Sequence, residues 1–383
     1  MDFITKPYFD KLVRQFKGNY RMRTFSCWDQ FLSMAFAQLT YRESLRDIEA
    51  CLNSVPNKLY HMGIKGNVSK SNLSRANEAR DYRIFENLAH KLIHHALSLY
   101  NKDELIFNDL NNALYAFDST VVDLCLALFP WAQHRKNKSA IRINTLLEIR
   151  TSLPTFINIS SGGVHEINSL DLIPVESLAI YIMDKGFIDF ERFFNINSLG
   201  AFFITREKKN SAYRRIYSSD VSAYENIICD QVIKMSGPKT HYLYPEKLRR
   251  IKYYDKINDK RLIFLTNNFS LSPSIVAILY KERWKIELFF KWIKQHLKIK
   301  SFYGRNENAM KSQIWIAISI YVLIIIIKKK LSLDQNIYTI LQILSVNVLS
   351  KILLKELFIN QTNLFTIEPT NNQLLLFDIG MGQ

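Results

Sequence analysis

The sequence has little cysteine and few acidic side chains relative to its bases. Its four cysteines, Cys27, Cys51, Cys125 and Cys229, form no C-x-x-C pair. This pattern argues against a disulfide framework or a thiolate zinc site and predicts a reduced, cytoplasmic protein. The sequence also lacks a glycine-rich phosphate loop, an internal repeat and a low-complexity tract. The N-terminus, MDFITKPYFDKL, has no apolar signal-peptide core, so we do not expect secretion.

Long apolar runs are scarce as well. The one candidate, IWIAISIYVLIIII at residues 314–327, is followed by three lysines. Crossing a bilayer takes about 20 apolar residues. We therefore expect this run to form a buried core helix, and we expect no membrane partner.

The shortage of acids gives the chain a strong positive charge. Lys+Arg number 51 against 35 Asp+Glu, which gives a net charge of +16 and a pI near 9.5. Such an excess favours a polyanionic partner, either nucleic acid or an anionic membrane. With 48% hydrophobic residues the chain is globular, and its 383 residues suffice for two or three domains.

Residues 280–300, YKERWKIELFFKWIKQHLKIK, contain no glycine or proline and predict one helix. One face is apolar, with Ile286, Phe289, Ile293 and Leu297 at helical spacing. A neighbouring stripe places a single acid among bases: Arg283, Glu287, Lys291, Lys294 and Lys298. This stripe is either a solvated face with i,i+4 ion pairs or a carboxylate that holds a metal while its neighbours hold phosphates.

The spacing Y-x2-R-x3-E-x6-K, formed by Tyr280, Arg283, Glu287 and Lys294, resembles the signature of the insertion-sequence transposases of family four, a branch of the DDE transposases. The resemblance extends over roughly residues 20–330. It implies an α/β ribonuclease-H-like catalytic core, and two catalytic aspartates upstream, each at the end of a strand.

Two aspartates match this expectation. Asp118 lies in the strand pattern ALYAFDSTVV at 113–122, where an acid is disfavoured and must either end the strand or serve chemistry. Asp184 follows the apolar strand run at 178–183 and precedes a glycine turn, where α/β folds place active groups or an acid simply caps a helix. D-S-T and D-K-G-F resemble the family's aspartate motifs. Asp123 and Asp189 are the nearest alternatives.

Further strands are predicted at 141–149, 152–159, 200–206 and 261–266, and a short helix at 169–177. Family members often show His and Asp in the first of these strands, where this chain has Asn144 and Glu148. Neither position is one of the three core acids, so the departure affects detail more than function.

Residues 1–97 are predicted to form a helical domain. Ser44 begins a capped helix, Pro56 and Gly63 break the chain, and a second helix starts near residue 68, capped by Ser69 or Ser71. This is a helix-turn-helix pattern, in which the second helix enters the major groove; an ordinary helical bundle with a polar surface is the alternative. The exposed face of that helix is predicted to carry the DNA-contacting side chains Lys70, Asn72 and Arg75, together with Arg80.

The remaining boundaries place the catalytic domain at 98–330, with a β-rich insertion at 207–260, and a C-terminal helical region and tail at 331–383. Interleaved Lys, Arg and Tyr in the insertion suit contact with a DNA backbone and its bases, or a twisted hairpin with aromatic pairs. In the tail, QLLLF at Gln373–Phe377 resembles the peptide that docks on the replication sliding clamp. Chance or a terminal packing strand would explain it equally well.

Asp118, Asp184 and Glu287 are predicted to be the catalytic and metal-binding residues. Converging carboxylates repel each other unless cations lie between them, and hard oxygen ligands favour Mg²⁺ or Mn²⁺. Two ions about 4 Å apart would stabilise the attacking and leaving oxygens at phosphorus. Arg283, Lys294 and Lys298 would hold phosphates, and Tyr280 would bond a phosphate or stack on a base.

These observations predict a cut-and-paste transposase that acts on double-stranded DNA, namely element ends and target, as a dimer in its synaptic complex. It would reside in the cytoplasm, at the nucleoid when bound to DNA. A catalytically decayed transposase acting as a DNA-binding protein, and a stand-alone nuclease of the same fold, are the alternatives.

Overall fold

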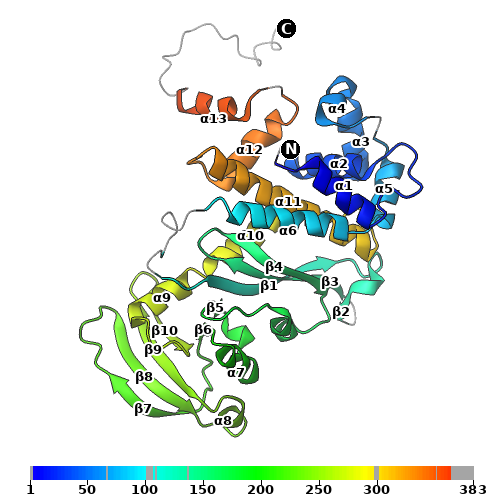
Figure 1. Cartoon of the computed structure of the whole chain (residues 1–383). Helices are drawn as coiled ribbons and strands as arrows, with labels where there is room; N and C mark the ends of the chain where they lie inside the picture. The colour runs from blue at the N-terminus through cyan, green and yellow to red at the C-terminus, as the bar shows by residue number, and fades with distance from the viewer. Residues whose placement is uncertain are drawn as a thin grey trace, which may run out of the picture.

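The computed structural model describes residues 3–65, 68–100, 107, 110–135, 138–296, 302–350 and 352–363 (Figure 1). Its N-terminal part is helical, as predicted. The helices there are α1 (Lys6–Gln15), α2 (Cys27–Leu39), α3 (Leu45–Asn53), α4 (Pro56–Met62), α5 (Lys70–Ala79) and α6 (Arg83–Leu97).

Side-chain caps fix where several of these helices start. The Ser44 hydroxyl accepts a hydrogen bond from the backbone N–H of Asp47. The hydroxyl of Ser69, not that of Ser71, accepts one from the backbone N–H of Asn72. Pro56 and Gly63 interrupt the helices as expected, because α3 ends at Asn53 and Gly63 follows the last residue of α4, but the short helix between them was not predicted. Proline in the first turn and glycine in the left-handed conformation after the last turn start and end this short helix.

Helix α11 (Glu307–Lys330) runs through the middle of the molecule. It packs against α2, α5 and α6 on one side and approaches α10 (Trp284–His296) on another (Figure 1). This is the one helix in the described chain that is long and apolar enough to cross a membrane, but 94% of its apolar window is buried inside the fold. The predicted buried core helix is confirmed, and it is longer than the apolar run alone.

A mixed ten-stranded sheet forms the centre of the described residues, in the order β2-β3-β1-β5-β6-β10-β9-β8-β7, with β4 paired to β3. Only the β1–β5 and β5–β6 pairs are parallel. The strands are β1 (Leu114–Leu124), β2 (Gln133–Arg135), β3 (Lys138–Glu148), β4 (Leu153–Ser161), β5 (Ile180–Met183), β6 (Phe202–Arg206), β7 (Tyr213–Ser219), β8 (Ile227–Met235), β9 (Lys247–Asp255) and β10 (Lys260–Thr266).

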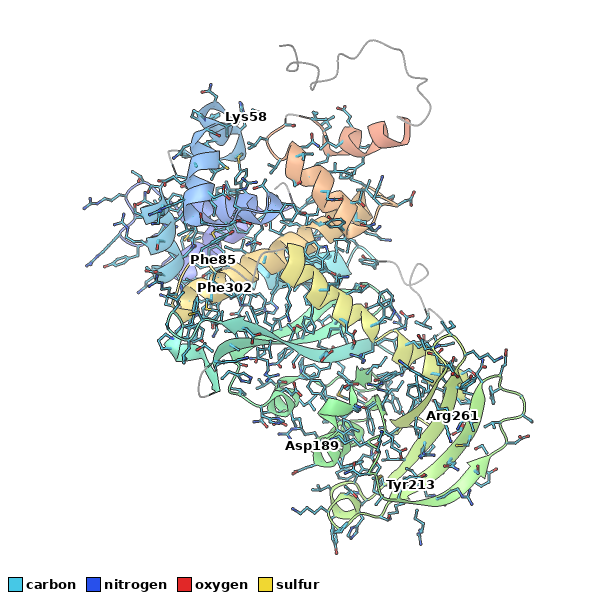
Figure 2. All side chains as sticks on the ribbon, turned by 180° about the vertical axis from the view of Figure 1, so that it is seen from behind. Lys58, Phe85, Asp189, Tyr213, Arg261 and Phe302 are labelled. Carbon is cyan, nitrogen blue, oxygen red and sulfur yellow. The ribbon has the colours of Figure 1, made fainter. Side chains whose placement is uncertain are left out.

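The predicted β-rich insertion continues the central sheet. Strands β7, β8 and β9 extend it beyond β10 and curve away from the helices, with Arg261 on β10 and Tyr213 on β7, the outermost strand (Figures 1 and 2). A buried ion pair joins β9 to β8: Arg249 donates to Asp230 at 2.6 Å, and the same guanidinium donates to the backbone carbonyl of Leu271 at 2.5 Å. The outer strands are thereby tied to the loop that precedes α9 (Pro273–Lys281).

The two faces of the sheet are buried in separate cores because successive side chains of a strand point to opposite faces. On β1, Leu114 and Ala116 join the core that holds α6, α10 and α11. Tyr115 and Phe117 join a second core beneath α7 (Phe190–Ser198). This alternation determines which face each polar side chain of the strands occupies.

Two helical segments differ from expectation. The short helix predicted at 169–177 was wrong: a 3-10 turn spans Glu166–Leu172, with His165 at its start. The single helix predicted from residue 280 is two helices, α9 and α10, joined by i→i−3 hydrogen bonds through residues 282–286. The remaining helices are α8 (Thr240–Leu243), α12 (Ile337–Asn347) and α13 (Leu354–Asn363).

Candidate active site

Three polar side chains form a row across the parallel strands. The ladders pair Ala116 with Ile182 and Ile182 with Ile204. Two residues further along each chain stand Asp118, Asp184 and Arg206. The alternation described above places all three on the face of the sheet that α10 covers.

Asp118 was expected at the end of a strand. It lies instead midway along β1. The ladder with β5 ends at Phe117–Met183, while β1 continues for several residues paired with β3. Asp118 therefore stands where its parallel neighbour leaves the sheet. Burial raises the pKa of Asp118 to about 6, and the charges of Asp184 and Glu287 add to the rise, although the Ser119 backbone N–H and Arg283 oppose it.

Asp184 follows β5 directly and occupies a more polar setting. Arg206 donates to its Oδ1 at 2.8 Å, and the Tyr280 hydroxyl donates to the same oxygen at 3.3 Å. Burial would raise the pKa of Asp184, but the hydrogen bond and charge of Arg206, the Lys185 backbone N–H and the charge of Arg283 lower it below its ordinary value. The two neighbouring carboxyls are thus perturbed in opposite directions.

The α9–α10 junction brings the signature residues to this row. Tyr280, near the end of α9, bonds Asp184, whereas Arg283, between the helices, donates to Asp118 at 3.1 Å and also to Glu287 in the first turn of α10. The i,i+4 ion pair anticipated for a solvated stripe is present, but Arg283 extends it to a strand acid. Arg283 is largely buried, while more than half of the Glu287 side chain is exposed.

The apolar face of this segment is confirmed where the structure describes it. Ile286, Phe289 and Ile293 are buried, and Trp292 packs edge-on against Tyr321 of α11. Trp284 is half exposed. The face therefore anchors α10 between the sheet and α11.

A polar cluster on the opposite face of the sheet was not anticipated. Glu166 accepts hydrogen bonds from Ser119 at 3.1 Å and Arg142 at 2.9 Å, and the Ser119 backbone N–H donates to Asp118 at 2.8 Å. A Cβ at Gly186 would lie within 4 Å of both Glu166 and Asp184. Glu166 is thus linked to Asp118 through Ser119 and lies on the other side of Gly186 from Asp184. Its partners are distant in sequence, so only the sheet register reveals the cluster.

Arg206 was also missed, although a signal for it existed. It is the last residue of the strand predicted at 200–206, and that strand neighbours the one that ends before Asp184. The alternative acids have other positions. Asp189 caps α7 and pairs with Arg192 at 2.8 Å, and Asp123 is exposed on β1.

The predicted DNA-contacting side chains, apart from Tyr280 and Arg283, come from α10 and its continuation, from α5, and from Arg80 just after α5. Lys294 is half-buried on α10, beyond Glu287, and Lys298 lies outside the described residues. Lys70 and Arg75 are exposed on α5, with Asn72 half-buried and accepting from Arg75 at 2.8 Å. The expectation that Arg80 shares this exposed face was wrong. Arg80 folds back onto α2 and donates to the Ser26 carbonyl at 2.8 Å, because α5 ends at residue 79.

No group of three or more His, Cys, Asp or Glu side chains in the described part of the chain is close enough to hold a metal ion. The side chains of Asp118, Asp184 and Glu287 nevertheless suit a hard divalent cation. They supply carboxylate oxygens, and the charges of Asp184 and Glu287 act on Asp118. Arg283 supplies the positive charge between Asp118 and Glu287. A metal ion held by these acids would take over that compensation.

Comparison with known proteins identifies this region. A family model described as the transposase DDE domain matches residues 112–323, which include Asp118, Asp184, Tyr280 and Glu287. The chain belongs to this DDE transposase family. A second model, a domain of unknown function named DUF4372, matches residues 1–65. The resemblance inferred from the sequence is confirmed.

Relatives of this DDE family chain carry transposase names. A protein of Sinorhizobium fredii named as transposase y4zB is 31% identical over 215 residues, 55% of this chain and 60% of that protein. One of Geobacillus stearothermophilus, named for insertion sequence element IS5377, is 24% identical over 55% of each chain. One of Synechocystis, named for IS4SA, is 23% identical over 67% of this chain and 71% of its own. The match thus spans a little over half of the first two relatives.

Among solved structures, the piggyBac transposase synaptic complex with hairpin DNA covers 97% of this chain and 85% of its own. The TM-score is 0.46 and the sequence identity 12%.

Proposed function

We propose that this protein is a transposase that cleaves double-stranded DNA at the ends of an insertion sequence and transfers the strands to a target by a cut-and-paste route. The observation that carries the proposal is a set of hydrogen bonds from one junction: Tyr280 donates to Asp184, and Arg283 donates to Asp118 and Glu287. Family membership supports the reaction class.

The proposed architecture is a ribonuclease-H-like catalytic domain at 98–330 with its β-rich insertion at 207–260. A helical DNA-binding domain at 1–97 precedes it, and a C-terminal helical region and tail at 331–383 follow it. The antiparallel β3–β1 pair followed by the parallel β5 and β6 supports this description of the core. The described part of the C-terminal region is helical, in α12 and α13.

Asp118, Asp184 and Glu287 would hold Mg²⁺ or Mn²⁺, with two ions per site. Bound there, such ions would activate water or a DNA 3′-hydroxyl and neutralise the departing oxygen in an in-line displacement at phosphorus. Burial raises the pKa of Asp118 to about 6, and a cation held beside this carboxylate would stabilise its charged form.

The chain's own bases would position the DNA. The guanidinium of Arg283 is planar, and the side chain is largely buried against Asp118. If a metal ion neutralised Asp118, this guanidinium could bind the phosphate next to the cleaved bond through two hydrogen bonds. Arg206 and Tyr280 bond one oxygen of Asp184, which fixes the orientation of its carboxylate. Lys294, further along α10, would contact the flanking backbone.

The proposed partners are the inverted-repeat ends of the element and its target DNA, bound by a dimer in the synaptic complex. Lys70, Asn72 and Arg75 of α5 would read or grip the ends. The proposed location is the cytoplasm. The sliding-clamp peptide at Gln373–Phe377 lies outside the described residues and stays a sequence prediction.

The test is metal-dependent nicking and strand transfer on a duplex that carries the element's own flanking ends. Wild type would be assayed beside Glu287→Gln, with Glu191→Gln, an exposed acid on α7, as the matched control. Supporting results are cleavage and joining by wild type and control, lost in EDTA and in Glu287→Gln. Cleavage without joining would favour a stand-alone nuclease, and end binding without cleavage a decayed transposase. Cleavage that survives in Glu287→Gln would refute the site.

A further inference from the structure

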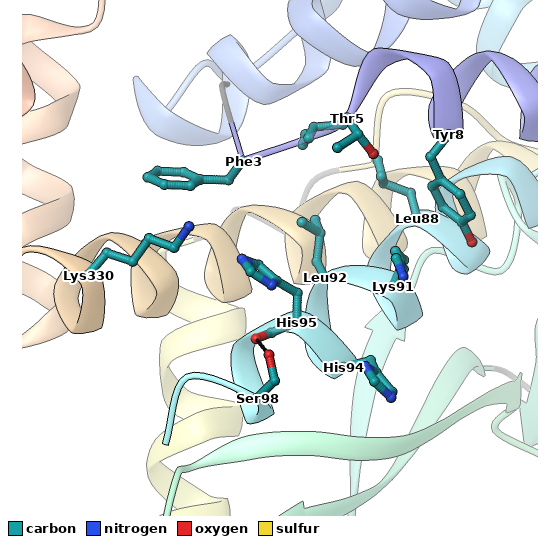
Figure 3. Close-up of a pocket in the computed structure, with 11 residues that line it drawn as sticks. Phe3, Thr5, Tyr8, Leu88, Lys91, Leu92, His94, His95, Ser98 and Lys330 are labelled. Atoms are coloured by element: carbon teal, nitrogen blue, oxygen red, sulfur yellow. Dashed lines mark hydrogen bonds between the residues drawn. The ribbon is translucent and has the colours of Figure 1, made fainter. Parts of the chain in front are cut away.

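A cationic pocket lies where the N-terminal segment meets α6 and the end of α11 (Figure 3). It is separate from the acid row, by which we mean Asp118, Asp184 and Glu287. Its volume is about 450 Å³. The segment before α1 forms one wall, with Phe3 and Thr5, and Leu88 and Leu92 of α6 form an apolar floor. In Figure 3, Lys330 and His95 approach the space from the ends of their helices, whereas His94 turns away.

The charge of this pocket has one sign. Its charged side chains are Lys91 and Lys330, which line it together with His94 and His95, and none of the described residues that line it is acidic. The Lys330 ammonium lies 4.8 Å from the centre of the Phe3 ring, and the Lys91 ammonium lies 5.8 Å from that of Tyr8. Aromatic faces can hold an ammonium in place but do not neutralise it. The positive charges of Lys91 and Lys330 can therefore still attract an anion.

The setting of His95 shows the same positive field. Burial lowers the pKa of His95, and the charges of Lys330 and Lys91 lower it further. All three influences disfavour a third positive charge, so the neutral imidazole is left with one N–H to donate. Thr5, at the start of α1, adds a hydroxyl that makes no capping bond, and the first turn of α1 contains no acid.

We propose that this pocket binds a phosphate group of the DNA backbone. Two lysines and neutral donors around an apolar floor suit a phosphodiester anion, because the lysines supply positive charge and the neutral groups supply hydrogen-bond donors. The described residues of the pocket lining include no carboxylate and no amide side chain with which to read a base edge. The contact would therefore position DNA without reading its sequence.

This inference rests on DNA as the partner proposed above, but not on the catalytic acids. The pocket is built from α1, α6 and α11, none of which contributes a residue to the acid row. It would therefore add a second contact for the duplex outside the catalytic centre. Binding here and cleavage there can be measured separately.

Lysine footprinting tests the pocket in the wild-type protein. Lys91 and Lys330 are exposed, so an acetylating ester modifies both in the free protein, as it does the exposed Lys58 and Lys239 elsewhere. Modification of each lysine would be quantified by mass spectrometry with duplex DNA, with inorganic phosphate, or with neither. We expect duplex DNA to protect Lys91 and Lys330 several-fold at a concentration that saturates binding.

The other outcomes separate the sources of phosphate. Protection by inorganic phosphate but not by DNA would overturn the DNA assignment and leave a small-anion site. DNA that protects other lysines but neither Lys91 nor Lys330 would overturn this inference alone. No protection of any lysine at DNA concentrations up to 100 μM would overturn the DNA partner as well.

Salt dependence gives a second, independent measurement. Each phosphate contact adds about 0.9 to the slope of log affinity against log salt concentration. The Lys91→Gln/Lys330→Gln double variant should lower that slope by about 2 relative to wild type, with an unchanged melting temperature. The matched Lys58→Gln/Lys239→Gln variant removes the same charge elsewhere and should keep the slope. Equal losses in the two variants would contradict a specific contact at the pocket.

Discussion

Replacing Asp118 by Asn should stabilise the protein at neutral pH. Asp118 is largely buried, and burial together with its acidic neighbours raises its pKa from 3.8 to about 6. Such a carboxyl binds its proton more tightly in the folded than in the unfolded chain. Folding stability is therefore lost as the pH rises from about 4 to about 6, and the loss is complete above that range.

The size of this effect follows from the two pKa values. A rise from 3.8 to about 6 corresponds to about 3 kcal/mol between the protonated and charged forms. Asn has the shape of the protonated acid and never gains the charge. Asp118→Asn should thus be within about 0.5 kcal/mol of wild type at pH 4 and exceed its free energy of unfolding by about 3 kcal/mol at pH 7.

Urea unfolding at pH 4, 5, 6 and 7 in the presence of EDTA measures the difference. Asp123→Asn, which changes an exposed acid on the same strand, should follow wild type throughout. Adding saturating Mg²⁺ at pH 7 should narrow the gap, because a ligand that binds only the folded wild-type site stabilises that state. Equal stability of Asp118→Asn and wild type at pH 7 without metal would refute the reasoning.

Three further changes test other parts of the structure. Arg249→Met leaves Asp230 buried without its partner and should cost about 3–5 kcal/mol of unfolding free energy, whereas Lys256→Met on an exposed pair should leave the urea midpoint unchanged. Gly200→Ala forces a side chain into a left-handed position with φ of 72° and should cost about 1–2 kcal/mol, also by urea unfolding; an unchanged midpoint would contradict this. Glu166→Gln should raise the Mg²⁺ concentration for half-maximal cleavage by about 10-fold or more, and unaltered metal dependence would remove Glu166 from the support of Asp118.

Local chemistry explains what the sequence could predict. Serine caps, apolar periodicity and strand runs act over a few residues, so the helices after Ser44 and Ser69 and the strands around Asp118 and Asp184 were predictable. The signature around Glu287 was recognisable because its residues are close in sequence. The helical registers of Tyr280 and Arg283 alone, however, could not show that they would bond different aspartates.

Features that depend on register between distant strands were not predictable. Arg206 reaches Asp184 only because β5 and β6 are parallel neighbours, and Glu166 meets Ser119 and Arg142 only across the other face of the sheet. No glycine or proline lies at the break between α9 and α10, so the sequence did not predict it. It occurs where the chain turns to present Arg283 to the sheet.

The burial of α11 limits how this chain can be divided. Trp315 and its neighbours are covered by the N-terminal helices on one side and by the catalytic part on another, so a single apolar core is shared by both. Neither part could be excised without uncovering the other. Exchange of the N-terminal helices between related elements would therefore require α11 to move with them, and selection would act on the two parts as one inherited unit.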